Sequence, residues 1–265
     1  MKIEQFTSSD IPLLPPLQPE GWLPLGPYYE FYIAAPFCHP IKYTVDGRLA
    51  GIGTGIRHRN TGWLAHIIVA PEYRRQGIGT HITRWLMNYF INEWKFRTIH
   101  LVATPMGEPV YSQLGFHRIT DYVFMRGGVI EDDTPADTVP FHDNIRDAAL
   151  ALDAEASFED RSQLLELHWP QGRFIRNNGT LEAFYLPTLG EGYIVARRVE
   201  AGLVLMRLKH RTGTVGVVPE QNHEAVRYLK ANGYSEYRRG IRMTYGEPLS
   251  WRPEMIYGRI GGNLG

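Results

Sequence analysis

Two segments of this chain repeat one pattern at a constant spacing, and this repeat limits the folds that the chain can adopt. The pattern Thr104-x-x-Gly107-x-x-x-Tyr111-x-x-x-Gly115-Phe116 returns as Asn222-x-x-Ala225-x-x-x-Leu229-x-x-x-Gly233-Tyr234, with every position offset by 118 residues. Each segment follows a run rich in β-branched residues and precedes an alternating run, which is typical of a strand, a short helix and a second strand. Self-similarity at a fixed offset indicates a repeated folding unit. The two halves of the chain are therefore predicted to be copies of one fold.

The first half has the pattern of a mixed α/β unit. Alternating or β-branched runs predict its strands, and Asp46-Gly47 predicts a hairpin turn of type I′. The expected strands are 1–6, 41–45, 49–57, 63–69, 98–103 and 117–126. The expected helices start after the N-cap Asp10 and lie near 28–35, 77–94 and 108–114. This order gives an α/β layer with a mixed sheet.

The second half follows an acidic segment rich in glycine, proline and threonine. The elements expected there are helices 144–156 and 160–168, hairpin strands 192–199 and 202–209, strand 213–218, helix 222–232, strand 235–245 and a loop-like tail. The predicted division is a first domain at 1–128, a linker at 129–142, a second domain at 143–246 and a C-terminal tail at 247–265. The fold class is α/β (α+β), with two mixed-sheet domains in tandem.

The stretch APEYRRQGIGT, residues 70–80, joins the predicted strand 63–69 to the predicted helix 77–94. A helix N-terminus presents unpaired N–H groups and partial positive charge, and Gly77 and Gly79 let an anion approach the backbone. Arg74 and Arg75 can add charge-assisted hydrogen bonds to phosphate oxygens. The alternative is a tight turn with solvated arginines. The second half has only residues 210–212 before its next strand, so the glycine turn and its helix are predicted to be absent there.

Three kinds of phosphate-binding loop are possible at this position. A P-loop needs a Gly-Lys pair, which the chain lacks. A dinucleotide fingerprint needs a third glycine after the first parallel strand, whereas Gly77-Ile-Gly79 lacks that glycine and follows the last strand of a meander. The Arg-x-x-Gly-x-Gly pyrophosphate loop of acyl-CoA enzymes matches Arg74-Arg-Gln-Gly77-Ile-Gly79.

With this loop, the stretches IIVAPEYRRQGIGTHI and VYSQLGF make residues 1–126 resemble the GNAT superfamily of N-acetyltransferases. The remainder resembles a degenerate second GNAT-like fold, as in tandem members. The resemblance implies that amides of Gln76–Thr80 hold the pyrophosphate of coenzyme A, that the backbone of Ile67–Val69 pairs with its pantetheine arm, and that Tyr111 protonates the departing thiolate. The implied cofactor-binding residues are Ile67, Ile68, Val69, Arg74, Arg75, Gln76, Gly77, Ile78, Gly79, Thr80 and Thr104. Thr104 stands where the family often has Asn, which the second copy keeps as Asn222.

The general base is not evident from the sequence. Alternation places Trp63, Ala65, Ile67 and Val69 on one face of their strand, without an ionisable group, and His66 on the other face. The candidates that stay open are His66, Glu30, His58, an acidic group of the second half, or a chain of water molecules.

Aromatic residues crowd the proline-rich segment 15–40. They can pack in the core under a long loop, or they can line a substrate pocket. We assign Trp22, Tyr28, Tyr29 and Tyr32 to a candidate acceptor pocket, since an aromatic wall suits a cationic or aromatic amine.

The charge balance of the chain argues against nucleic acid and anionic membranes as partners. Lys+Arg and Asp+Glu number 28 each, so no global field favours nucleic acid or an anionic membrane. The single cysteine, Cys38, excludes an intrachain disulfide and fits a reducing cytoplasm, and no secretory leader is evident. We expect no metal, acetyl-CoA as co-substrate, and a monomer or homodimer. The predicted function is transfer of an acetyl group from acetyl-CoA to a primary amine of a small molecule or peptide. A CoA-binding sensor without turnover and a structural protein whose loop binds nothing are the alternatives.

Overall fold

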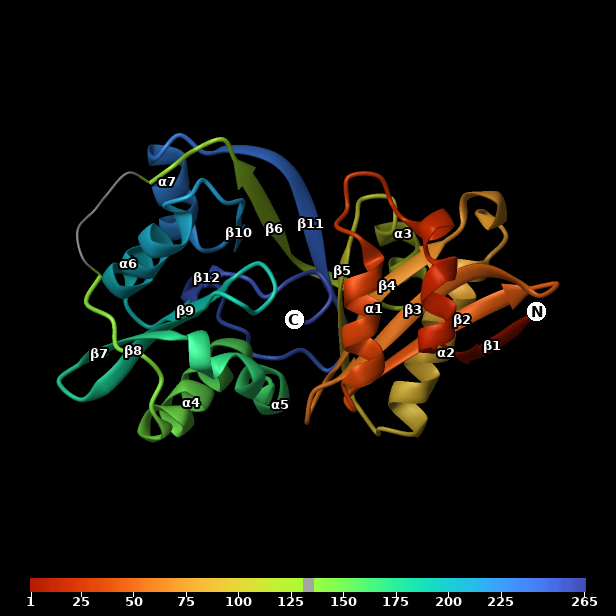
Figure 1. Cartoon of the computed structure of the whole chain (residues 1–265), viewed down its shortest axis with the longest axis horizontal. Coiled ribbons are helices and arrows are strands. Elements are labelled where there is room, and N and C mark those ends of the chain that lie inside the picture. The colour runs from red at the N-terminus through yellow and green to blue at the C-terminus, as the bar shows by residue number, and fades with distance from the viewer. Residues whose placement is uncertain (131–135) are drawn as a thin grey trace.

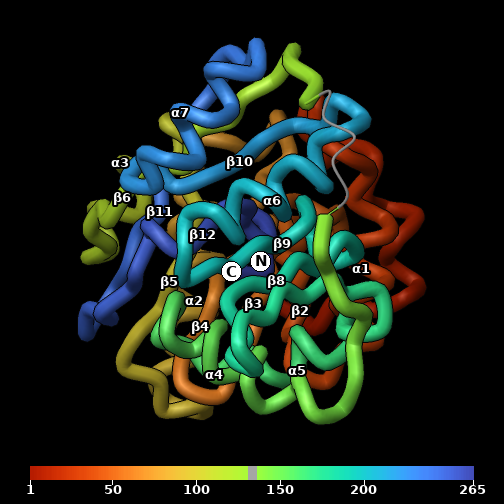
Figure 2. Tube along the Cα trace, turned by 90° about the vertical axis from the view of Figure 1, so that its left-hand side faces the viewer, coloured from red at the N-terminus to blue at the C-terminus, as the bar shows by residue number. Residues whose placement is uncertain are grey.

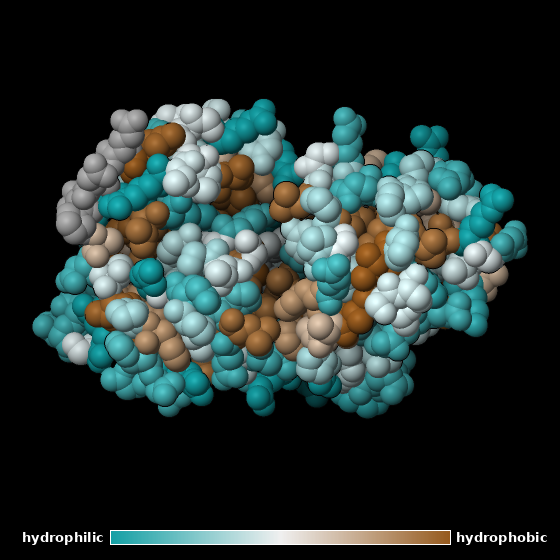
Figure 3. All heavy atoms as spheres, viewed as in Figure 1, coloured by the Kyte–Doolittle hydropathy of each residue, from teal (hydrophilic) through white to brown (hydrophobic). Residues whose placement is uncertain are grey.

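The structure is a computed structural model that describes residues 1–130 and 136–265 (Figure 1). Residues 131–135 lie outside the described part, inside the expected linker. Within the described ranges no helix is long and apolar enough to cross a membrane. Hydrophilic side chains cover most of the face drawn in Figure 3.

The first half contains the predicted elements in the predicted order. Its strands are β1 (Lys2–Gln5), β2 (Cys38–Val45), β3 (Arg48–Arg57), β4 (Gly62–Val69), β5 (Thr98–Ala103) and β6 (His117–Arg126). Its α-helices are α1 (Leu25–Ala34), α2 (Ile78–Asn92) and α3 (Glu108–Gln113). Asp46 and Gly47 have φ of 48° and 76°, so the type I′ turn is confirmed. Thr7, and not Asp10, caps the first short helix, because Thr7 and Asp10 form a capping box.

The second half repeats this order from its first long helix onward. Its helices are α4 (Arg146–Ser157), α5 (Ser162–Leu165), α6 (Val199–His210) and α7 (His223–Ala231). Its strands are β7 (Arg173–Asn177), β8 (Thr180–Leu186), β9 (Tyr193–Ala196), β10 (Gly216–Pro219), β11 (Ser235–Gly246) and β12 (Ile256–Gly258). The β7–β8 hairpin turns at Asn178-Gly179, both at positive φ, and the sequence analysis assigned no element to it.

The predicted strand 202–209 is wrong, because these residues belong to helix α6. The buried positions of α6 are Ala201, Gly202, Leu205, Met206, Lys209 and His210, which is the spacing of one helix face. The second half therefore keeps the helix that was expected to be absent and lacks only the glycine turn. Two residues separate β9 from α6, whereas eight separate β4 from α2.

The two halves exchange their last strands. The large sheet has the order β1-β2-β3-β4-β5-β11-β6-β10, so β11 of the second half lies between β5 and β6 of the first. In turn, β6 of the first half pairs with β10 of the second. Figure 1 shows β6 and β11 side by side between the two halves. Each half thereby completes the sheet of the other.

A smaller sheet, of order β12-β9-β8-β7, lies in the second half. Helix α4 packs on one face of it and α6 on the other, as the end-on view in Figure 2 shows. The tail predicted as loop-like contains β12, and most of residues 255–265 are buried. One apolar cluster runs through both halves, and its members include Tyr29, Trp63, Leu152, Phe184 and Ile260. The halves consequently share a core.

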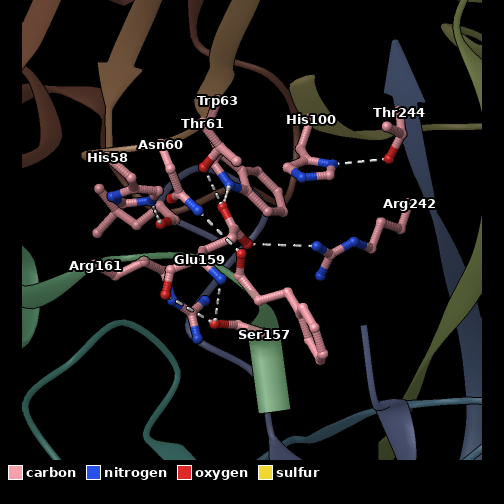
Figure 4. A network of polar contacts seen from close by, with 12 residues as sticks. His58, Asn60, Thr61, Trp63, His100, Ser157, Glu159, Arg161, Arg242 and Thr244 are labelled. Atoms are coloured by element: carbon pink, nitrogen blue, oxygen red, sulfur yellow. Dashed lines mark hydrogen bonds and ion pairs between the residues drawn. The ribbon is translucent and has the colours of Figure 1, made fainter. Parts of the chain in front are cut away.

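A buried carboxylate, Glu159, joins the halves (Figure 4). It accepts hydrogen bonds from Thr61 Oγ1 at 2.6 Å and Trp63 Nε1 at 2.7 Å, and Arg242 Nη2 lies 3.5 Å away. Burial raises the pKa of Glu159, but the charged Arg161 and Arg242 beside it hold that pKa below its ordinary value. The charged form is therefore the stable one here.

Candidate active site

The loop before α2 forms an open cradle at the helix N-terminus. Gly77 is the N-cap, in the left-handed region with φ of 79°, and no side chain caps the first turn. A Cβ on Gly77 would meet nothing within 4 Å, and one on Gly79 only Val69 at 3.6 Å. Arg74, Arg75 and Gln76 are exposed. The free N–H groups and the two arginines can together receive an anion.

Strands β4 and β5 separate as they approach this cradle. They pair in parallel only from Gly62 opposite Ile99 to Leu64 opposite Leu101. Beyond Leu64 the β5-facing edge of β4 has no strand partner, so the backbone of Ile67–Val69 can pair with an extended ligand, as the resemblance implied. We call this gap between β4 and β5 the splay. It joins the face of the sheet that α2 covers to the face that α1 covers.

A β-bulge at His66 overturns the alternation expected for β4. His66 has φ of 46°, and the pairing with β3 shifts between Ile52 and Thr54. The bulge inserts a residue, so the side chains after it change face. Ala65 and Ile68 pack with the α1 core, while Ile67 and Val69 pack on the α2 side. Trp63, Ala65, Ile67 and Val69 therefore do not share a face.

A cavity of ≈ 650 Å³ fills the splay and extends through the sheet. Its lining includes six of the predicted site residues, Ile67, Ile68, Val69, Arg74, Thr104 and Tyr111, and all but Ile68 lie toward the α2 side. The remaining cradle residues, Arg75, Gln76, Gly77, Ile78, Gly79 and Thr80, adjoin this end at the start of α2. Thr104 also accepts a hydrogen bond from Gly107 N at the start of α3.

Tyr111 stands on α3 at the α2 side of the cavity. Its ring contacts Phe116, and its hydroxyl has no hydrogen-bond partner among the described residues. Burial raises the pKa of the Tyr111 phenol to about 12. The hydroxyl consequently stays protonated at neutral pH and is available as a proton donor.

The structure divides the four residues of the predicted aromatic wall. Trp22 and Tyr28 line the cavity, on the face opposite Tyr111, but Tyr29 and Tyr32 are fully buried. Tyr32 instead supports His66, whose Nδ1 lies 2.9 Å from the Tyr32 hydroxyl. Asn263 of the tail donates to that hydroxyl at 2.7 Å.

This relay fixes the tautomer of His66. Because Tyr32 accepts from Asn263, its own hydrogen goes to His66 Nδ1, which leaves the His66 proton on Nε2. Burial lowers the pKa of His66 to about 4, so the ring is neutral at physiological pH. His66 lines the cavity as a neutral donor and does not suit the role of general base.

Two of the other candidate bases, His58 and Glu30, lie outside the cavity. His58 is fully buried and bonds the carbonyl of Leu264, and Glu30 is exposed on α1. The second half does supply a carboxylate to the cavity, Glu191, which precedes β9. Glu191 pairs with Arg259 of the tail at 2.7 Å.

The sequence analysis missed a set of cavity residues from the second half and the tail. These are Glu191, Arg238, Arg239, Gly240, Arg259, Gly262 and Asn263. Arg259 stands between apolar and glycine residues in MIYGRIGGNLG, and a lone charge in such a stretch is a signal of a specific partner.

The corresponding splay of the second half is filled by the tail. β12 pairs with β9, and Arg259 N donates to Val217 O of β10. Asn222, the counterpart of Thr104, donates to the carbonyls of Glu254 and Ile256. Asn222 therefore holds the protein's own backbone in the second half.

Comparisons with known proteins agree with this geometry. Residues 29–130 match the family model of the acetyltransferase (GNAT) domain. The fold is similar to that of a candidate acetyltransferase from Pyrococcus horikoshii, with a TM-score of 0.83 and 20% identity over 100% of this chain and 95% of the other. No curated protein matches the chain in sequence.

Two further solved structures cover nearly the whole chain. A GCN5-related N-acetyltransferase from Sphaerobacter thermophilus has a TM-score of 0.64 and 15% identity, over 94% of this chain and 98% of the other. A tandem GNAT protein from the clavulanic acid biosynthesis pathway has a TM-score of 0.59 and 13% identity, over 94% and 99%. The resemblance to GNAT acetyltransferases and the tandem mixed-sheet fold are confirmed.

Proposed function

We propose that the GNAT acetyltransferase domain at residues 29–130 transfers the acetyl group of acetyl-CoA directly to a primary amine. The observation that carries this proposal is the cavity itself. It runs from beside the uncapped start of α2, along the open edge of β4 and past Tyr111, to the end lined by Trp22 and Tyr28, which we call the acceptor chamber. One ligand can thus reach the reaction centre from each face of the sheet.

The chain offers a fitting site for acetyl-CoA on the α2 side. The amides from Gln76 to Thr80, with Arg74 and Arg75, would hold the pyrophosphate, because these groups are exposed and uncapped. The backbone of Ile67–Val69 would pair with the pantetheine arm. Thr104 would line its path. When bound, acetyl-CoA supplies an activated acetyl group as a thioester.

Residues of both faces would then serve the transfer. The amine nitrogen forms the bond to the acetyl carbon as the carbon–sulfur bond breaks. Tyr111 gives its proton to the departing thiolate. The bulge leaves His66 and Ile67 without partners on β3, so a backbone N–H in this segment can stabilise the developing oxyanion. The amine proton passes to water, since both oxygens of Glu191 are bonded to Arg259.

The filled splay in the second half supports one binding site per chain. There the tail takes the backbone partners of β9, and the loop that would hold a pyrophosphate is missing. We propose that residues 143–265 shape the acceptor chamber of the first half and bind no second acetyl-CoA.

The test is acetyl-CoA-dependent thermal stabilisation followed by thiol release with a panel of primary amines. A ligand that binds only the native state raises the apparent melting temperature. We expect stabilisation that Gly77→Asp abolishes, and thiol release that requires an amine. Stabilisation without release on any amine would favour a CoA sensor, and no stabilisation would favour the structural protein.

A further inference from the structure

The acceptor chamber contains a buried arginine with an unused donor. The Arg259 side chain is 4% exposed and donates from Nε and Nη2 to the two oxygens of Glu191, at 2.8 and 2.7 Å. Its Nη1 has no hydrogen-bond partner among the described residues. A buried charged donor without an acceptor is costly, so the position of Arg259 indicates a missing acceptor.

The charges around Glu191 do not balance. Lys209 of α6 is also buried, and its Nζ donates to Gly192 O at 3.0 Å. Burial lowers the pKa of Lys209 to about 8, against the opposing effect of Glu191, so the amine is mainly charged at neutral pH. Two buried cations thus share one carboxylate, and both oxygens of that carboxylate are already bonded to Arg259.

The unused donor lies beside the cavity wall. A Cβ built on Gly262 would lie 3.8 Å from Arg259 Nη1, and Gly262 and Arg259 both line the cavity. Since Gly262 has no side chain, nothing from that residue stands between the guanidinium and a ligand. Gly190 keeps the neighbouring loop in place, because its φ is 57° and a Cβ there would lie 1.8 Å from the carbonyl oxygen of Ile260.

A second arginine reaches the same part of the cavity. Arg238 of β11 is exposed and stacks on Phe124 with 4.0 Å between its Cζ and the ring centroid. Arg259 lies 4.5 Å from the same ring. No carboxylate among the described residues pairs with Arg238, whereas the adjacent Arg239 contacts Asp121, Glu220 and Glu236.

We propose that Arg259 Nη1 and Arg238 bind a carboxylate of the acceptor, so that the acceptor is an amino acid-like molecule with an amine and a carboxylate. This inference rests on the proposed function of the same cavity. Trp22 and Tyr28 supply an apolar wall for the part of the molecule between its charges. A polyamine is disfavoured beside Arg259, because it would bring further positive charge to Arg238, Arg259 and Lys209, where Glu191 is the one carboxylate that the second half contributes to the cavity lining.

The test compares pairs of amines that differ only by the carboxylate, tyrosine with tyramine and phenylalanine with phenethylamine. Thiol release from acetyl-CoA gives kcat/KM for each. We expect the amino acids to be preferred at least about tenfold, the usual scale of one charge-assisted contact. Equal rates, or a preference for the decarboxylated amines, would overturn the inference.

Two variants test the site without removing the buried pair. Arg238→Gln removes an exposed cation, and Gly262→Val fills the space beside Arg259 Nη1. Both are expected to reduce the preference for the amino acids about tenfold or more and to leave the KM for acetyl-CoA unchanged. Arg84→Gln, an exposed cation of α2 outside the cavity lining, is the matched control and should change neither value.

Binding measurements separate the two proposals. Thiol release with tyramine but not with tyrosine would contradict the carboxylate site and leave the acetyltransferase function intact. A second outcome is that calorimetry detects tyrosine binding, that Arg238→Gln weakens this binding, and that no amine causes thiol release. This outcome would contradict the acetyltransferase function and support the carboxylate site. Absence of both tyrosine binding and tyrosine-dependent release would overturn the inference.

Discussion

Gly240 of β11 lies directly opposite Tyr122 of β6, and these two positions are 118 residues apart in the chain. The offset equals that of the repeated pattern, so the strand exchange is centred on a pair of equivalent positions. A Cβ on Gly240 would approach Val102 at 3.0 Å and Phe124 at 3.2 Å, which leaves little room for a side chain. The exchanged strand β11 also carries Arg238 to the cavity, so the exchange builds part of the cavity lining.

The exchange predicts that the halves unfold together. A fragment of residues 1–128 would lack both β11 and β10, leaving one edge of β5 and both edges of β6 unpaired. We expect one cooperative transition for the whole chain in urea, seen alike by tryptophan fluorescence and circular dichroism, and an aggregating or unfolded fragment. Two separate transitions in the whole chain would contradict this.

Glu159→Gln should destabilise the chain strongly. The amide keeps the shape but cannot balance Arg242, and breaking a buried ion pair costs about 3–5 kcal/mol. Denaturant unfolding measures the loss. Glu247→Gln removes an exposed partner of Arg97 and should cost no more than about 1 kcal/mol. Equal costs in the two variants would show that the Glu159 network contributes little.

Stability should fall as the pH drops below the ordinary histidine pKa of 6.5. Burial lowers the pKa of His100 to about 3, so this ring stays neutral in the folded state and takes up a proton on unfolding. Below pH 6.5 the unfolded state therefore binds more protons than the folded state. For one such group the free energy of unfolding falls by about 1.4 kcal/mol per pH unit. Urea midpoints from pH 7.5 to 5 measure the slope. In His100→Gln the slope of the unfolding free energy against pH should decrease by about 1.4 kcal/mol per pH unit, which is the contribution of one proton. An unchanged slope would exclude His100 as the cause.

Tyr111→Phe should lower kcat by roughly 10²–10⁴-fold, the range of a lost general acid, and leave acetyl-CoA binding intact. Because the pKa of Tyr111 is raised to about 12, the wild-type enzyme should show no loss of this proton donor below about pH 11. Steady-state kinetics across pH provides the measurement. Tyr89→Phe, on the outer part of α2, is the control. A kcat reduced less than about twofold would assign Tyr111 to packing alone.

Calorimetric titration should give one acetyl-CoA per chain. The first half has the cradle and an open splay, while the tail and Asn222 fill the splay of the second half. Gly77→Asp should abolish binding, because a carboxylate at the helix N-cap places negative charge where the pyrophosphate binds. Two equivalents per chain, or one remaining in the variant, would place a site in the second half.

The sequence predicted the first half nearly element by element, because its signals are local. Asp46-Gly47 fixed a type I′ turn, the glycines at 77 and 79 marked an uncapped helix start, and the constant offset revealed the repeat. The strand assigned to 202–209 was wrong, because a short apolar run fits a strand or a buried helix equally well when periodicity is the only criterion.

The site residues also differ in whether local sequence signals or the tertiary structure reveal them. The residues of the cradle and Tyr111, whose roles stay predictions, could be singled out from their spacing, because they lie on one strand–loop–helix unit and the next short helix. The face of His66 was missed, because a bulge inverts the alternation and leaves no mark in composition. The burial of Tyr29 and Tyr32 depends on α1 packing against the shared core.

By itself, the sequence indicated two similar halves and one glycine turn before a helix, at residues 74–80. Only the tertiary structure decided that the halves exchange strands, that the tail fills the second splay, and that Glu191, Arg238 and Arg259 meet the first-half cavity. The reason is physical. Turns, caps and helix faces depend on residues a few positions apart, whereas strand exchange and a chamber built from Trp22 and Arg259 depend on contacts across the whole chain.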